Sequence, residues 1–317
     1  YDATRGILSP HFQDLAPACL DPSTLKTFAP CQAEAMAMMD RQDAAHCFSH
    51  GERSTQFRHL LGMWLALVNT LKPNLVVFPS SPHMVYDFIV LEICRQRSIR
   101  TLMFDRTQVP GLILPQQDYA SGPLNLEQAY RAKLEAASAQ SGQTMDLSSA
   151  AETRLAKMRG DYREARPYHL RFKQHLRDKP LSLLQEARKF LRKGPPESYD
   201  KLPGRHVQDK GRTLREHLTL IRRARRIRKH LTELYENLCR VPDLAQPYVF
   251  AALQCQPERS TSPDGGVFVH QELMVRMLAE SVPPGWLVLV KDHVSQLRNY
   301  QRGERARSEE FYRSLVE

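Results

Sequence analysis

Near the start of the chain, apolar residues follow a helical period and then form short continuous runs. Over 54–72 they recur at steps of three and four residues, which predicts an amphipathic helix. Two apolar runs follow, at 75–78 and 100–104, and the residues between them predict a second helix over 84–97. A strand, a helix and a strand within so short a span predict two parallel strands joined by a right-handed crossover.

The same order of elements returns near the other end of the chain. Apolar runs at 248–254 and 286–290 flank a predicted helix over 267–281. Because the run at 286–290 has no polar alternation, like the one at 75–78, we expect a central strand that is covered on both faces. The polar residues 291–293 follow it directly, at the edge where open parallel sheets bind their ligands.

Two loops at the carboxyl ends of the first pair of strands carry further candidates. Residues 79–83 follow one strand and Asp105-Arg106-Thr107 follow the other, so both loops should flank one crevice. His83 and Asp105 are the candidate catalytic residues there, with His83 acting as a base or contacting an acceptor. The alternative is that His83 belongs to a helix cap and has no chemical role.

The segment between the two blocks is helical and basic. Residues 124–240 contain strong helix formers, interrupted by a Pro- and Gly-rich loop at 193–212 and ending in a long helix over 213–239. Of the net charge of +10, residues 151–240 carry 25 Lys and Arg against 11 Asp and Glu, which is +14, and the rest of the chain carries −4.

This basic segment has three interpretations. It is a solvated helix face, it binds an anionic surface such as lipid headgroups or an acidic glycan, or it binds nucleic acid. Because its aromatic residues form no RNA-binding motif, we expect no nucleic-acid partner. Peripheral contact with a membrane would run through 213–230. The affinity for a purely electrostatic partner should fall steeply as salt is added, whereas binding in a small-molecule cleft should be less sensitive to salt.

The cysteines and acidic residues limit the chemistry further. Six cysteines are widely scattered without a CxxC pair, which predicts reduced thiols, a cytoplasmic location and no zinc site. No DxD motif ends a predicted strand, so we expect no metal and no cofactor. A chain of 317 residues suits about two domains. Only two strands follow residue 247, and we expect the chain to be a fragment whose last domain is incomplete.

Two stretches of the chain resemble a known family. The stronger match, over 253–296, reads "LQCQPERSTSPDGGVFVHQELMVRMLAESVPPGWLVLVKDHVSQ", and the weaker one, over 72–104, reads "KPNLVVFPSSPHMVYDFIVLEICRQRSIRTLMF". Both are similar to the capsule polysaccharide synthesis family of bacterial surface-carbohydrate glycosyltransferases. Where that family usually shows Glu-His-Pro, this chain has Asp292-His293-Val294.

The resemblance implies an α/β fold of the GT-B-like class, with two Rossmann-like parallel-sheet units separated by the basic helical section. The expected divisions are an amino-terminal Rossmann-like domain at 1–123, the helical section at 124–242 and the start of a nucleotide-sugar domain at 243–317. The implied activity is sugar transfer from a nucleotide-sugar donor to a polysaccharide or glycolipid acceptor, in the cytoplasm or at the inner membrane. The alternative is a non-catalytic protein that binds an acidic partner through its basic helices.

The candidate donor-binding residues come from the second block. A histidine N–H such as that of His293 can donate to a phosphate oxygen, and a lysine such as Lys291 can supply a point charge. The loop after the first strand of this block opens a helix, where backbone N–H groups bind anions readily. Its candidates are Gln256, Arg259, Thr261, Gly265 and Gly266. The alternatives are a solvated strand end and an ordinary helix-entry turn.

Overall fold

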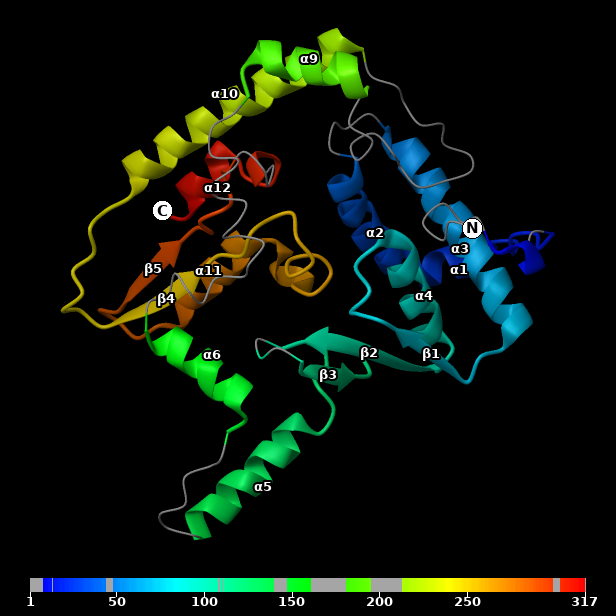
Figure 1. Cartoon of the computed structure of the whole chain (residues 1–317), viewed down its shortest axis with the longest axis horizontal. Helices are drawn as coiled ribbons and strands as arrows, with labels where there is room; N and C mark the ends of the chain where they lie inside the picture. The colour runs from blue at the N-terminus through cyan, green and yellow to red at the C-terminus, as the bar shows by residue number, and fades with distance from the viewer. Residues whose placement is uncertain are drawn as a thin grey trace. The chain divides into compact units, whose positions relative to one another are not determined.

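The protein has a mixed α/β structure. The computed structural model describes residues 8–12, 14–43, 48–107, 109, 111–139, 147–160, 181–194, 213–298 and 303–316 (Figure 1). The chain divides into two compact units. One contains Tyr1–Leu67, His83–Ile89 and Arg177–Glu317, and the other contains Val68–Pro82 and Val90–Leu176. The three divisions expected from the sequence remain a prediction.

A three-stranded sheet forms the centre of the second unit. Strands β1 (Leu75–Phe78) and β2 (Arg100–Arg106) are parallel, with Leu75 opposite Arg100, which confirms the first predicted pair. Strand β3 (Ile113–Gln116) was not predicted; it pairs antiparallel with β2, which is therefore the middle strand.

The prediction that the first strand is covered on both faces is wrong for the described structure. In β1 only Phe78 is buried, and Val77 on the alternate face is 55% exposed. Asp105 and Arg106 belong to β2 and pair with β3, and this corrects their predicted place in a loop after the strand.

The helices around 54–72 and 84–97 form close to their predicted positions. Helix α3 spans His50–Leu71, and Lys72 ends it with a positive φ of 45° directly before Pro73, which cannot continue a helix. Helix α4 spans Val85–Gln96 and buries Ile89, Leu91 and other apolar side chains, as its period requires.

Two helices near the amino terminus were not predicted. After the short 3-10 helix η2 (Pro10–Phe12), α1 spans Pro22–Thr27 and α2 spans Ala29–Gln42. Met38 and Met39 of α2 are buried with Phe57 and Leu60 of α3, so these helices supply core to the first unit.

The middle section is helical where the structure describes it, as predicted. It contains α5 (Leu126–Ala139), α6 (Ser149–Arg159), α9 (Leu183–Lys193) and α10 (Leu214–Leu238). The last two begin with capping boxes, Ser182 with Gln185 and Thr213 with Glu216, which satisfy backbone N–H groups that have no partner inside the helix. Most of the predicted loop at 193–212 lies outside the described residues.

The second parallel pair also forms as predicted. Strand β4 (Tyr248–Ala252) pairs in parallel with β5 (Leu287–Lys291), and Ala252 lies opposite Lys291. The 3-10 helix η3 (Gly266–Val269) and α11 (Gln271–Ser281) connect the strands, and η4 (Gly303–Arg305) and α12 (Glu309–Ser314) follow them. Ser308 caps α12 by accepting a hydrogen bond from Phe311 N at 3.1 Å.

The predicted central position of the second strand is wrong within the described residues. There, β5 pairs with β4 alone, and its apolar side chains Leu287 to Val290 are only half-buried. Phe250 of β4 is 56% exposed as well. The small sheet is therefore open on part of its surface.

Candidate functional site

Two buried glutamine side chains hold the chain that follows β4. The side chain of Gln271 accepts a hydrogen bond from Gln254 N at 2.6 Å and donates one to Gln254 O at 3.1 Å. Gln296 makes the same pair with Gln256, at 2.8 and 2.9 Å. Each amide thus satisfies the backbone donor and acceptor of one residue, as a neighbouring strand would. The two amides fix the path of the loop that leaves the sheet.

A buried ion pair joins this loop to the one after β5. The side chain of Arg307 is fully buried and that of Asp292 is 6% exposed. Arg307 donates to both carboxylate oxygens of Asp292, through Nη2 at 3.0 Å and Nε at 3.2 Å. Tyr312 Oη donates to the same carboxylate at 2.6 Å, and His293 N donates to it at 2.8 Å. Asp292 is therefore a structural anchor.

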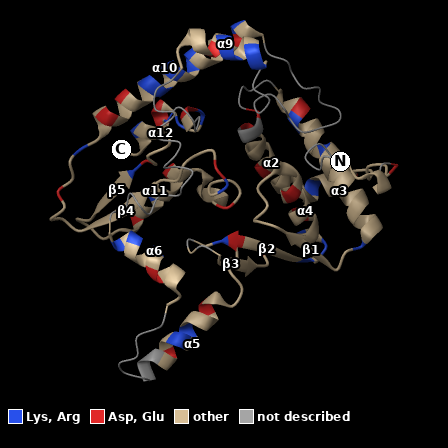
Figure 2. Ribbon diagram, in the orientation of Figure 1, with Lys and Arg blue, Asp and Glu red and all other residues tan. Residues whose placement is uncertain are grey.

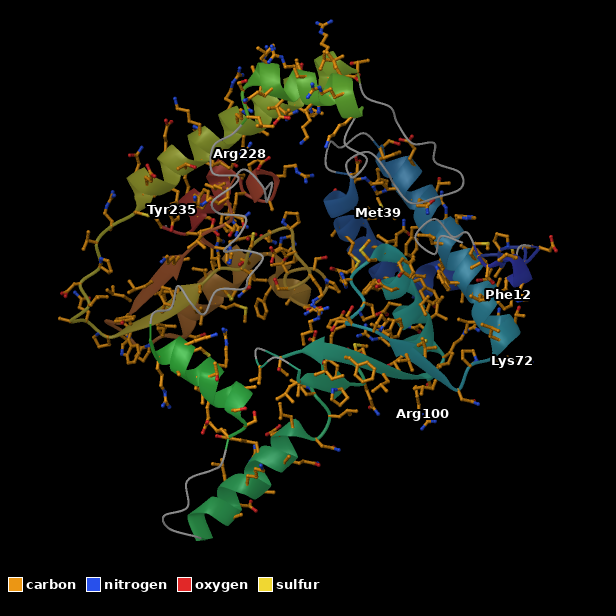
Figure 3. All side chains as sticks on the ribbon, viewed as in Figure 1. Phe12, Met39, Lys72, Arg100, Arg228 and Tyr235 are labelled. Atoms are coloured by element: carbon orange, nitrogen blue, oxygen red, sulfur yellow. The ribbon has the colours of Figure 1, made fainter. Side chains whose placement is uncertain are left out.

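Nearby residues complete this anchor. Arg307 also donates to Gln254 O at 3.3 Å and to the side chain of Gln256. Tyr235 of α10, labelled in Figure 3, packs against Tyr312 with ring centroids 5.4 Å apart and ring planes inclined by 58°. Burial raises the pKa of Tyr312, and so does the adjacent Asp292 carboxylate, which keeps the phenol protonated as a donor.

Gln256, a predicted donor-binding residue, belongs to the scaffold. Its Oε1 accepts from Arg307 and its Nε2 donates to Val269 O at 2.8 Å, so both ends of the amide are occupied. Burial also raises the pKa of the neighbouring Cys255 thiol to about 12, so this cysteine is protonated at neutral pH and is not a nucleophile.

His293 is held in a defined orientation at the carboxyl end of β5. Its Nδ1 accepts a hydrogen bond from Ser295 N at 3.2 Å, and its own backbone N–H is bound to Asp292. With Nδ1 as an acceptor, the neutral ring carries its proton on Nε2. The half-buried ring thus presents a fixed N–H donor beyond the strand. Lys291, the last residue of β5, is exposed.

The predicted glycine-rich anion loop forms a compact turn. Arg259 forms an ion pair with Asp264 at 3.2 Å, and Thr261 is buried with its hydroxyl donating to Glu258 O at 2.8 Å. A Cβ at Gly265 would lie 2.7 Å from Thr261 O, so only glycine fits there.

The next residue does not open an α-helix as expected. Gly266 has a φ of +51° and begins a 3-10 turn, and its N–H donates to Pro263 O at 3.0 Å. Helix α11 starts later, at Gln271. The Gly266 N–H is consequently used within the turn, and the glycines are explained by backbone geometry.

In the other unit, Asp105 is joined to the loop after β1. Gln116 of β3 is buried, and its Nε2 donates to Ser81 Oγ at 3.0 Å and to Asp105 Oδ2 at 3.4 Å. Gln116 therefore links Asp105 of β2 to Ser81 of the loop after β1. His83, the other predicted catalytic residue, belongs to the segment His83–Ile89 of the first unit.

Asp87, four residues beyond His83, is a titratable group that sequence analysis missed. Burial raises the pKa of its carboxyl to about 6, although backbone N–H groups of His83 and Met84 oppose the shift. Its Oδ1 is buried and has no hydrogen-bond partner among the described residues. Asp87 is the third residue of α4, the position at which a capping box places an acidic side chain. This position relative to the start of the helix is the sequence signal that could have revealed it.

Comparisons with other proteins do not assign this chain to a family. No protein-family model matches the chain, and neither the curated proteins nor the solved structures gave a match. Among the described residues, no three His, Cys, Asp or Glu side chains are grouped closely enough to hold a metal ion. No described helix has the length and apolar content needed to cross a membrane.

Proposed function

We propose that this chain binds a nucleotide-sugar donor at the carboxyl edge of β4 and β5, as part of a GT-B-like glycosyltransferase of capsule or surface-polysaccharide synthesis. The resemblance of 253–296 to that family supports the proposal. The observation that carries it is the placement of His293 just beyond β5, where Ser295 N holds the ring through Nδ1 and the backbone N–H of His293 is bound to Asp292.

The chemistry expected of this donor follows from the reaction. When the bond between the sugar and the phosphate breaks, negative charge grows on the departing nucleoside diphosphate. A fixed N–H donor that binds a phosphate oxygen stabilises that charge, because no reorganisation is needed as the charge develops. Lys291, exposed at the adjacent position, would add a point charge to the same phosphate.

The acceptor hydroxyl of the polysaccharide or glycolipid must lose its proton as the new glycosidic bond forms. His83 and Asp105 are the proposed candidates for that proton transfer or for contact with the acceptor. The donor is a substrate, and the proposed reaction uses no further cofactor.

The test is nucleotide binding by the 317-residue protein, measured by isothermal titration with UDP, GDP, ADP and CMP as separate probes. For the probe that binds, His293→Ala should weaken affinity by about tenfold or more, since a hydrogen bond to a charged group contributes about 1.5–3 kcal/mol. His293→Gln retains an N–H donor and should lose less affinity.

A histidine elsewhere in the same unit provides the matched control. His50, exposed at the start of α3, should be replaceable by alanine without any change in affinity. If none of the four probes binds, or if His293→Ala binds with parental affinity, the proposed donor site is wrong.

A second candidate function, binding of an acidic partner through the basic helices, is favoured by the exposed arginines of α10. Arg222, Arg223 and Arg226 are exposed, whereas Arg225 donates to Leu181 O and the side chain of Arg228, only 13% exposed, lies beside Glu304. Only part of 213–230 is therefore available for the proposed peripheral membrane contact. An affinity that falls steeply with salt would identify this mode.

A further inference from the structure

Helix α9 exposes two leucines beside the face that packs on α10. Leu184 is 61% exposed and Leu191 is 73% exposed, and their spacing of seven residues places them on one line along the helix. On the adjoining face, the ring of Phe190 packs against His217 of α10 with centroids 5.0 Å apart. The helix is thus anchored by one face and exposes two leucines next to it.

Cationic side chains lie along one side of these leucines. Helix α9 carries Arg188, Lys189, Arg192 and Lys193 against the single acid Glu186, which gives four positive charges, one negative charge and a net of +3 (Figure 2). Arg188 lies between the two leucines on the same line. A shallow hollow in the surface is lined by the four cations together with Gln185.

Helix α5 shows that exposed leucines alone are not the distinguishing feature. Leu126 and Leu134 of α5 are also about half exposed, but the charges of that helix cancel, since Glu127 and Glu135 balance Arg131 and Lys133. Exposed leucines and an excess of positive charge occur together on α9. This combination is typical of helices that lie in the interface of an anionic bilayer.

We propose that α9 docks on a membrane that contains anionic lipids, with Leu184 and Leu191 at the boundary of the acyl chains and the four cations on the lipid phosphates. Helix α10 acts as the support that presents α9. The leucines distinguish this partner from nucleic acid, because a phosphate backbone offers nothing to an exposed leucine. The inference is independent of sugar transfer.

The test is cosedimentation of the 317-residue protein with vesicles of phosphatidylcholine that contain 30% phosphatidylglycerol, and with vesicles of phosphatidylcholine alone. The parent should bind the anionic vesicles and not the neutral ones. Leu184→Ala with Leu191→Ala should weaken binding by about tenfold for each leucine. Arg188→Gln with Arg192→Gln should weaken it by about fivefold for each cation.

Helix α5 supplies the matched control. Leu126→Ala with Leu134→Ala removes two half-exposed leucines from a helix without excess charge and should leave vesicle binding unchanged. Leu191→Trp should give a blue-shifted tryptophan emission with anionic vesicles relative to the parent protein, and Leu134→Trp should not.

Two outcomes would overturn the proposal. One is parental binding by the α9 leucine variant, which would leave only a general attraction between charges. The other is displacement of the vesicles by single-stranded RNA together with RNA affinity unaffected by the leucine substitutions, which would make the cationic helix a nucleic-acid surface. Because all substituted side chains are exposed, thermal unfolding of the variants should match that of the parent.

Discussion

Removing the carboxylate of Asp292 should destabilise the protein far more than removing a comparable carboxylate from the surface. In Asp292→Ala, the fully buried Arg307 keeps its charge and loses both of its hydrogen bonds to the acid, and Tyr312 Oη loses its acceptor. Leaving one member of a buried ion pair unpaired costs about 3–5 kcal/mol. We expect the free energy of unfolding to fall by that amount.

The surface comparison is the pair Glu127 and Arg131 on α5, where the guanidinium also binds the carboxylate through two nitrogens, at 2.6 and 3.1 Å. Its side chains are 76% and 71% exposed, so Glu127→Ala should cost no more than about 0.5 kcal/mol. Urea unfolding followed by circular dichroism measures both variants, with Asp292→Asn as a milder replacement if the alanine variant does not fold.

The coupling between the two buried charges provides the sharper test. Arg307→Met leaves Asp292 without its cation, and the double variant removes both charges at once. Because the double variant contains no unpaired buried charge, its cost should be less than the sum of the two single costs by about 2 kcal/mol or more. Additive single costs, or an Asp292→Ala cost within 1 kcal/mol of the Glu127→Ala cost, would refute the anchor role.

Two further predictions concern stability. The pKa of Asp87 is about 6 in the folded protein against an ordinary value of 3.8, so the folded state binds this proton more tightly than the unfolded state. The stability that the protonated carboxyl contributes is therefore present below pH 4 and is lost as the pH rises through 6. Asp87→Asn should therefore be more stable than the parent at pH 8, by on the order of 2 kcal/mol, and this difference in stability should shrink at pH 4.5. Urea unfolding at both pH values measures the difference, and an equal difference at the two pH values would contradict the prediction. A methyl group at Gly303 would overlap Gln296 O, so Gly303→Ala should lower the thermal midpoint by several degrees, whereas Gly51→Ala in α3, where space is free, should not lower it.

The sequence predicted the elements whose pattern is local. Continuous apolar runs in the sequence predicted the parallel pairs β1–β2 and β4–β5. Apolar residues at helical steps predicted the helices α3, α4 and α10. Strand β3 was missed because it is four residues long and contains Pro115, and because its pairing with β2 decides its conformation. Helix α2 was missed because alanines and methionines give it little contrast between faces.

The candidate site was only partly predictable for a similar reason. His293 and Lys291 could be placed from the end of one apolar run. The partners that orient this region, Gln271, Gln296 and Arg307, lie up to 53 residues from the atoms that they bind, and nothing in the local pattern of residues 254–256 indicates which distant side chain will meet them. The prediction that the strands at 75–78 and 286–290 are covered on both faces was also wrong, because a strand's apolar content does not show what packs on its second face.

Asp292 and His293, adjacent in sequence, should therefore respond in opposite ways to substitution. The carboxylate of Asp292 is directed into the ion pair with Arg307, so its loss should appear as reduced stability. The backbone of His293 is part of the same anchor, but its Nε2 takes no part in the hydrogen bonds that hold the ring, so His293→Ala should lower nucleotide affinity and leave unfolding almost unchanged. If His293→Ala instead destabilises the protein as strongly as Asp292→Ala, the imidazole is a packing element of the anchor. The proposed phosphate donor would then have to be sought elsewhere along this edge, with the exposed Lys291 as the next candidate.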